Sequence, residues 1–396
     1  MMLRYYLTLF IVALVTTWWI FKKVLRIAMM KNIVDNPDAR KLQKTPVPVL
    51  GGIAVFFGMI VALTVTRLTF DTYSLFAIMG VMTIMLYLGV MDDILSLSPR
   101  LRFIVEILVV LLLMFSNKYA INDFQGLWGI DQISDWIAIP LTVIACVGII
   151  NAINMIDGVN GLSSGYGIMA SAVFGAAFII SNDRDAASLA ILSVGALLPF
   201  FFHNVFGKKS KMFIGDGGTL LMGTIMSAFV IGAINVNSPL AAKVGPNFGV
   251  IAFVLAVLVI TIFDCIRVMI SRILRKTSPF YPDKTHLHHL FIDLKFSHAA
   301  TAFTEVMLSV LTIAIWWTSY KLGASIDLQL YIVIGLGLLF TFGIYTFLRR
   351  QEKNNTKLYQ ALQRFGQRTH LGHTSGWMKF RDFLDRNLEE LENINK

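Results

Sequence analysis

Residues 73–93 read YSLFAIMGVMTIMLYLGVMDD, an uncharged and mostly apolar run that ends in two adjacent aspartates. A helix that crosses a bilayer needs roughly 20 mostly apolar residues, so this run is long enough to span a membrane. The two acids then lie at the boundary of the span. Adjacent carboxylates at such a boundary repel each other and resist loss of water, which points to a bound cation, a proton or a function.

Similar apolar runs recur along most of the chain, separated by short polar or charged breaks. With 56% hydrophobic and 15% charged residues and a mean hydropathy of +0.69, the chain lies outside the range of soluble domains. We therefore predict an all-α, polytopic membrane protein with about eleven spans. Two short spans, 103–117 and 187–203, leave the count open by one. The expected spans are 5–24, 48–68, 73–91, 103–117, 136–153, 161–180, 187–203, 213–234, 248–270, 303–321 and 328–348.

The basic residues are distributed unequally between the two sides of this topology. Alternate loops place 28 of the 34 Lys and Arg residues on one side. By the positive-inside rule, that side is the cytoplasm, the N-terminus lies outside and the C-terminus inside. The net charge of +10 thus sets orientation in a bacterial inner (plasma) membrane and attracts anionic membrane lipids, so it does not indicate nucleic-acid binding.

Two regions are expected. Residues 1–348 form the transmembrane domain, and residues 349–396 form a cytoplasmic basic tail with apolar positions at helical spacing. That pattern predicts amphipathic helices that lie on the inner membrane surface or pack on a partner.

The basic side also holds the clusters of carboxylates, amides, glycines and histidines. Asp92 and Asp93, followed by Arg100 and Arg102, fit a Mg²⁺ site or a general base. Upstream, residues 35–52 join a basic stretch that includes Lys44 to a Pro- and Gly-rich entry into the second span. Cations there are candidates to hold phosphate, although an ordinary positive-inside loop explains them equally well.

Residues 151–161, NAINMIDGVNG, lie between two spans with no room for a conventional loop. Asn151 and Asn154 share a helical face, and Gly158 and Gly161 permit a tight turn and a close approach of backbone to ligand. Turn formation alone explains this array of amides, glycines and one carboxylate, Asp157, poorly.

Two further clusters complete this side. Residues 213–219, FIGDGGT, follow three lysines and open a span; such a turn offers free N–H groups to an anion, and Asp216 is suited to Mg²⁺. Residues 282–289, PDKTHLHH, hold three of the seven histidines. Without a nearby cysteine, phosphate contact or proton handling is favoured over zinc.

Hard carboxylates, cations and amides in one place are the parts that phosphoryl transfer requires. A soluble donor explains why the site faces the cytoplasm. An acceptor carried in the membrane explains why the protein is almost entirely transmembrane helix.

In order and in placement, these five motifs between about Asp35 and Leu290 resemble those of the polyprenyl-phosphate N-acetylhexosamine-1-phosphate transferases. The resemblance implies that UDP-N-acetylglucosamine gives its sugar-1-phosphate to undecaprenyl phosphate and releases UMP. It also implies a requirement for Mg²⁺, with Mn²⁺ as an alternative, and a place at the first membrane step of a cell-surface glycopolymer pathway such as lipopolysaccharide or teichoic-acid synthesis.

The resemblance also implies roles for individual residues. Asp92 and Asp93 match the acidic pair that deprotonates or positions the acceptor phosphate, and Asp157 matches an acid near metal and diphosphate. Asp216 matches the principal Mg²⁺ ligand, and Phe213 matches an aromatic that stacks on uracil. The remaining matches are His286 as a catalytic residue and Asn154, Asn204, His288 and His289 as substrate-binding residues. Lys44 and Arg100 are further candidates for substrate binding because of their charge.

Two positions depart from the family pattern. The motif around Asp157 usually has a second aspartate where this chain has Asn160, so we assign Asn160 to substrate rather than metal. The first motif often carries a histidine where this chain has Gln43, which removes a proton-transfer role from that position.

Three alternatives stay open. The first is that the donor is another UDP-N-acetylhexosamine. The second is that the protein is a membrane transporter, although the interiors of its spans hold few acids apart from Glu106 and Asp264. The third concerns oligomeric state, because no sequence feature decides whether the protein forms a homodimer.

Overall fold

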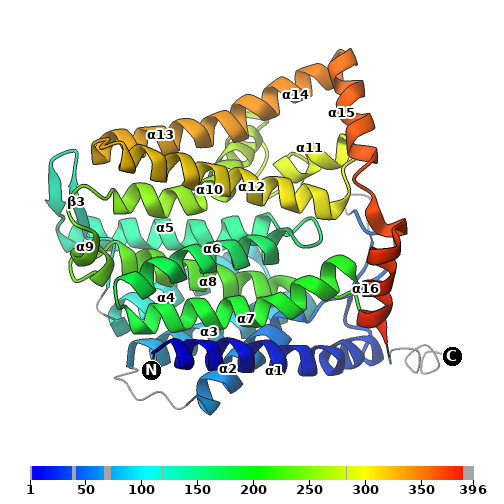
Figure 1. Cartoon of the computed structure of the whole chain (residues 1–396), viewed down its shortest axis with the longest axis horizontal. Coiled ribbons are helices and arrows are strands. Elements are labelled where there is room, and N and C mark those ends of the chain that lie inside the picture. The colour runs from blue at the N-terminus through cyan, green and yellow to red at the C-terminus, as the bar shows by residue number, and fades with distance from the viewer. Residues whose placement is uncertain (1, 38–41, 67–72, 118, 282, 387–396) are drawn as a thin grey trace.

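The computed structural model describes residues 2–37, 42–66, 73–117, 119–281 and 283–386. Within these ranges the chain is mostly helical, and the long helices run side by side as one bundle (Figure 1). Helices α15 (Lys357–Gln367) and α16 (Ser375–Asp385) lie across one end of this bundle. The short helix α9 (Pro239–Val244) and strand β3 (Asp123–Leu127) lie at the opposite end.

Nine helical segments among the described residues are long and apolar enough to cross a membrane, which confirms the all-α polytopic class. They are α1 (Met2–Met30), α3 (Tyr73–Leu95), α5 (Asp135–Met155), α6 (Leu162–Ile180), α7 (Arg184–Phe206), α8 (Gly215–Ala233), α10 (Val250–Leu274), α12 (His298–Lys321), and α13 (Ile326–Leu338) continued by a π-helical turn (Leu339–Gly343) and α14 (Ile344–Lys353).

The other two expected spans are also helices, but one is short and the other carries charged residues near its start. Helix α2 (Gly51–Val65) is apolar but has only 15 residues, fewer than the 48–68 span predicted. Helix α4 (Pro99–Asn117) carries Arg100, Arg102 and Glu106 in its first two turns. By length and composition, therefore, α2 and α4 are weaker candidates than the nine.

The sequence did not predict the two small hairpins. Strands β1 (Val34–Asp35) and β2 (Val47–Pro48) pair near α2, and β3 pairs with β4 (Ile130–Gln132) at the end away from α16. Trp128 and Gly129 join β3 to β4 with positive φ angles, a backbone typical of tight hairpin turns. Asp123 and Asp131 belong to this second hairpin.

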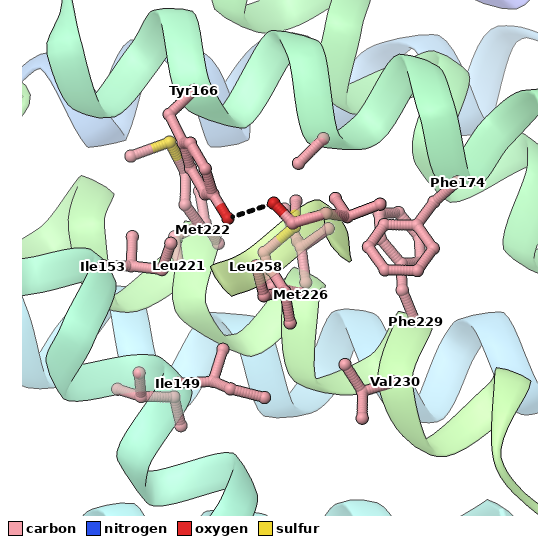
Figure 2. Packing of buried hydrophobic residues seen from close by; sticks show 14 of the residues in the cluster. Ile149, Ile153, Tyr166, Phe174, Leu221, Met222, Met226, Phe229, Val230 and Leu258 are labelled. Atoms are coloured by element: carbon pink, nitrogen blue, oxygen red, sulfur yellow. Dashed lines mark hydrogen bonds between the residues drawn. The ribbon is translucent and has the colours of Figure 1, made fainter. Parts of the chain in front are cut away.

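Helix α8 is the most buried of the nine candidate spans. Apolar side chains of α8 meet residues from α5, α6 and α10 in one continuous core (Figure 2). Within it, the Tyr166 hydroxyl donates a hydrogen bond of 2.9 Å to the Val257 carbonyl, which satisfies a polar group inside the bundle. On the opposite side, Gly52 of α2 and Gly89 of α3 contact the first turn of α8 backbone to backbone.

We expect Gly89→Ala to destabilise the protein by about 1–3 kcal/mol, because a Cβ at this position collides with the backbone of Asp216 and Gly217. Thermal unfolding of the purified protein would measure the loss. Gly80 lies on the same helix with no atom within 4 Å of an added Cβ, so Gly80→Ala is the matched control and should leave the midpoint unchanged or slightly higher. Equal midpoints for the two variants would contradict close α3–α8 packing.

Candidate active site

Two adjoining cavities open at the end of the bundle where α15 and α16 lie. The first has a volume of about 740 Å³ and the second about 550 Å³. The residues that border both are Asn154, Asp157, Gly158, Asp283 and His289. All five come from the two motifs at 151–161 and 282–289 that the sequence singled out, so those motifs form the wall that the cavities share.

The first turn of α8 is fixed by Asp93 of α3. One carboxylate oxygen accepts the amide of Asp216 at 3.0 Å, and the other accepts the amide of Gly217 at 3.3 Å. Hydrogen-bond acceptors at a helix N-terminus are favourable because the first amides have no partner in the helix. Gly215 precedes these amides with a φ of +74°. Asp93 was predicted to deprotonate or position the acceptor phosphate; here its carboxylate holds the α8 turn and borders the second cavity.

Arg102 of α4 holds the acidic cluster together. Its guanidinium lies 3.1 Å from an oxygen of Asp92, 3.1 Å from Glu106 and 3.7 Å from Asp216. It also donates to the amide oxygen of Asn154 at 2.7 Å. Charge-assisted hydrogen bonds of this kind are the stronger ones in proteins, so Arg102 fixes three helices relative to each other.

Asn154 connects the motif at 151–161 to α8. Its amide nitrogen donates to Asp216 at 2.6 Å and to Thr219 at 2.7 Å. Both predicted residues, Asn154 and Asp216, thus occur in the same cluster as Asp92. The sequence analysis placed Arg102 with the acid pair but treated Glu106 as an isolated interior acid. Their spacing of four residues on a helix is the signal that would have paired them.

Among the described residues, no three His, Cys, Asp or Glu side chains are grouped closely enough to hold a metal ion by themselves. Mg²⁺, however, is usually held by one or two carboxylates with substrate phosphates and waters as the other ligands. Asp92 and Asp216 fit this smaller set, since both contact the same guanidinium. The donor set therefore suits a metal that arrives with a phosphorylated substrate.

Asp157, at the wall that the cavities share, accepts a hydrogen bond of 2.5 Å from the Ser163 hydroxyl. The residue borders the open cavities, yet the protein around its carboxylate removes enough water to raise its pKa to about 6. The negative charge of Asp216 raises the pKa further, and the Ser163 hydroxyl opposes the shift.

The histidine motif is anchored by an acid of α10. Asp264 lies 2.8 Å from Nδ1 of His286, accepts the amide of Leu287 at 3.1 Å and pairs with Arg267 at 2.6 Å. It thereby fixes the start of α11 (Leu287–Asp293) and the ring of His286, which borders the first cavity. The sequence noted Asp264 as an interior acid but could not pair it across 22 residues.

Of the other two histidines, His288 is buried and His289 is partly buried. A Cβ at Gly158 would collide with the ring of His288, which is why a glycine fits here. Desolvation lowers the pKa of His288 well below its usual value and that of His289 to about 4. Both rings are therefore neutral near pH 7. Their nitrogens can accept or donate hydrogen bonds there without adding positive charge.

Asp283 lies beside these histidines and pairs with Arg272 at 2.9 Å and Arg275 at 2.6 Å. Desolvation raises the pKa of this carboxyl, but the hydrogen bonds from the two arginines and Thr285 outweigh it and hold the pKa well below its usual range. Asp283 was not among the predicted site residues. Its neighbours in the sequence, the histidines, were the available signal.

The second cavity contains Phe213 and Asn160, as expected, together with Lys211 and Gln43. Asn204 also borders it, but its oxygen accepts the Gly161 amide and its nitrogen donates to the Met212 carbonyl. These contacts assign Asn204 to the support of two loops.

Two predicted cations lie in different places. Arg100 is exposed and borders the first cavity. Lys44 is exposed and borders neither cavity, and the neighbouring 38–41 stretch lies outside the described residues.

We expect Asp264→Asn to lower stability by about 3–5 kcal/mol, because it leaves the buried Arg267 without its counter-charge. Thermal unfolding would show the loss. The control is Asp293→Asn, whose half-exposed carboxylate pairs with Arg349 and should cost about 1 kcal/mol or less. A wild-type midpoint for Asp264→Asn would refute the anchoring role.

Comparison with known proteins is consistent with this geometry. The sequence profile of glycosyl transferase family 4 matches residues 75–234, which include the acid pair, the 151–161 motif and the α8 turn. A probable undecaprenyl-phosphate N-acetylglucosaminyl 1-phosphate transferase of Bacillus subtilis (strain 168) is 31% identical over 296 residues, 73% of this chain and 78% of the relative.

Two enterobacterial relatives carry the name undecaprenyl-phosphate alpha-N-acetylglucosaminyl 1-phosphate transferase. The one from Salmonella typhi is 26% identical over 308 residues, 76% of this chain and 80% of its own. The one from Escherichia coli (strain K12) is 25% identical over 296 residues, 73% of this chain and 77% of its own. The chain therefore belongs to glycosyl transferase family 4.

Proposed function

We propose that this protein transfers N-acetylglucosamine-1-phosphate from UDP-N-acetylglucosamine to undecaprenyl phosphate, which yields a lipid-linked diphosphate sugar and UMP. The observation that carries the proposal is the cluster of Asp92, Arg102, Asn154 and Asp216 beside the wall that two cavities share. Two phosphorylated substrates need two adjoining sites, and relatives that cover most of this chain are named for this reaction.

The composition of the cavities supports a division between the two substrates. The second cavity has Phe213, which offers a ring to a base, and Lys211, which offers a positive charge to a diphosphate. The first cavity has Phe103 and Phe280 on its border, and both side chains are more than two fifths exposed. Apolar rings of this exposure suit the start of a prenyl chain, so we assign the first cavity to the acceptor and the second to the donor.

In the proposed reaction, an oxygen of the lipid phosphate attacks the sugar-linked phosphorus and UMP leaves. A phosphate monoester has a second pKa of about 6, so it is largely ionised at neutral pH and needs little help from a base. Arg102 balances the charge of the acids, and the histidines offer hydrogen bonds to phosphate oxygens. Bound Mg²⁺ would be held by Asp216 and Asp92 and would neutralise charge on the diphosphate.

We also propose that the cavities face the cytoplasm of a bacterial plasma membrane and that α2 and α4 complete eleven crossings. The support is the excess of Lys and Arg on the side of the cavities. Soluble nucleotide sugars are available in the cytoplasm, so a site that faces this compartment can bind one.

The test is UMP release by purified protein with UDP-N-acetylglucosamine and undecaprenyl phosphate, with and without Mg²⁺. We expect metal-dependent release, and a loss of at least about 100-fold for Asp216→Asn, because it removes a charge aimed at the reacting phosphates. Asp131→Asn is the control, since this exposed aspartate lies in the hairpin at the opposite end.

Two results would change the proposal. Activity only with another UDP-N-acetylhexosamine would replace the donor and leave the reaction class intact. No turnover of any nucleotide sugar, under conditions in which a relative is active, would overturn the enzyme assignment.

A further inference from the structure

The last described helix, α16, packs on the bundle rather than projecting from it. Aromatic rings form the contact, with Trp377 at 4.5 Å and Phe380 at 5.2 Å from the ring of Phe206 on α7. Phe383 lies 6.0 Å from the ring of Trp18 on α1. These rings are only partly buried, but the neighbouring Leu384 is fully buried, and α16 packs across the end of α7 (Figure 1).

At the end of this helix, Asp385 binds the backbone of the loop that connects α7 to α8. Its carboxylate accepts the amides of Lys208 at 3.2 Å, Lys209 at 3.0 Å and Ser210 at 3.0 Å. It also accepts the Ser210 hydroxyl at 2.7 Å. Successive amides that converge on one anion form a backbone nest, and here the anion is a side chain 175 residues away.

The hydrogen bonds favour the charged form of this carboxylate. Desolvation raises the pKa of Asp385, but the bonds from Ser210 and the three amides outweigh it and hold the pKa below its usual value. The carboxylate is therefore ionised at neutral pH. Ser210 is fully buried, so loss of Asp385 would leave its amide and hydroxyl without these partners.

The loop leads directly into the donor cavity. Lys211 follows Ser210, Phe213 comes two residues later, and both side chains border the second cavity. Asp216 comes next but is held separately, because Asp93 binds the amides at the start of α8. The loop and the acid cluster thus have independent supports.

We propose that Asp385 is a positioning residue that clamps the 208–210 loop and so sets the place of Lys211 in the donor cavity, whereas Phe213 is also held by backbone hydrogen bonds to Pro48 and Gly51. The inference rests on the proposed function for the identity of the donor. It assigns to the C-terminal segment a role in nucleotide binding, exerted through the loop and without contact with substrate.

If Asp385 acts only through the loop, its loss should weaken donor binding and leave the rate of the chemical step almost unchanged. In the full-length protein, Asp385→Ala should raise KM for UDP-N-acetylglucosamine about tenfold with kcat within about twofold, as for loss of an interaction made equally in ground and transition states. Asp385→Asn, which keeps one oxygen acceptor, should fall between. Asp382→Ala on the same helix is the matched control. The Asp382 carboxylate is 71% exposed, and among the described residues its ion pair is with the neighbouring Arg381.

Trypsin provides a readout that does not depend on activity. It cuts after lysine, and the loop offers Lys208, Lys209 and Lys211. Cleavage needs a locally open backbone, so we expect Asp385→Ala to be cut within 208–211 about tenfold faster than wild type and Asp382→Ala at the wild-type rate. Mass spectrometry of the fragments identifies the site.

The two readouts separate the possible failures. Equal cleavage and equal KM for Asp385→Ala and Asp382→Ala would overturn the clamp, as would a fall in kcat with KM unchanged. If wild type turns over no nucleotide sugar, the proposed function fails, and the cleavage rates alone decide whether Asp385 holds the loop.

Discussion

Close contact between the backbone of α8 and that of α2 and α3 is the constraint on which the site depends. Gly52 and Gly89 bring their helices so near that a Cβ at either position would overlap the first turn of α8. Asp93 then binds the free amides of that turn. Since the turn is held from several sides, the carboxylate of Asp216 has a defined position before any substrate arrives. Such preorganisation is what phosphoryl transfer gains from a protein.

The acid cluster shows how a membrane protein keeps several charges together at the end of a bundle. Arg102 comes from α4, Asn154 from the end of α5 and Asp216 from α8. Each contact joins two helices, so the same bonds that neutralise the acids also fix the helices. A second acid, Asp264, performs the corresponding task for α11 by binding its first amide and the ring of His286. The Arg102 cluster and Asp264 thus hold the two motifs that form the shared wall of the cavities.

The sequence predicted much of this site because its motifs contain residue types that are costly at a membrane boundary. Asp92, Asp93, Asp157, Asp216 and the histidines stood out against apolar spans, and the resemblance of their order to a known family supplied roles. Partnerships across the chain were not predictable in the same way. Asp264 appeared as an isolated interior acid, and only the folded chain shows that His286, 22 residues later, contacts it.

For the fold, the sequence predicted the long helices well and the shorter elements less well. Hydropathy locates long spans well because the bilayer sets their length. It was less informative for α2, which is short, and for α4, which carries charge in its first turns. The β3–β4 hairpin was missed because its strands lack regular alternation of apolar and polar residues. For the tail, spacing predicted amphipathic helices but not the surface that α16 covers.

The long separation between Asp385 and its loop has a consequence for biosynthesis. Ser210 and Asp385 are 175 residues apart, so at a synthesis rate of about 5–20 residues per second the loop precedes its partner by about 10–35 s. Several helices enter the membrane during this interval. The first turn of α8 can be held by then, because α2 and α3 are made before it. Part of the donor cavity therefore takes its final form much later than the acid cluster, and a nascent chain acquires its charged centre before it can hold a nucleotide firmly.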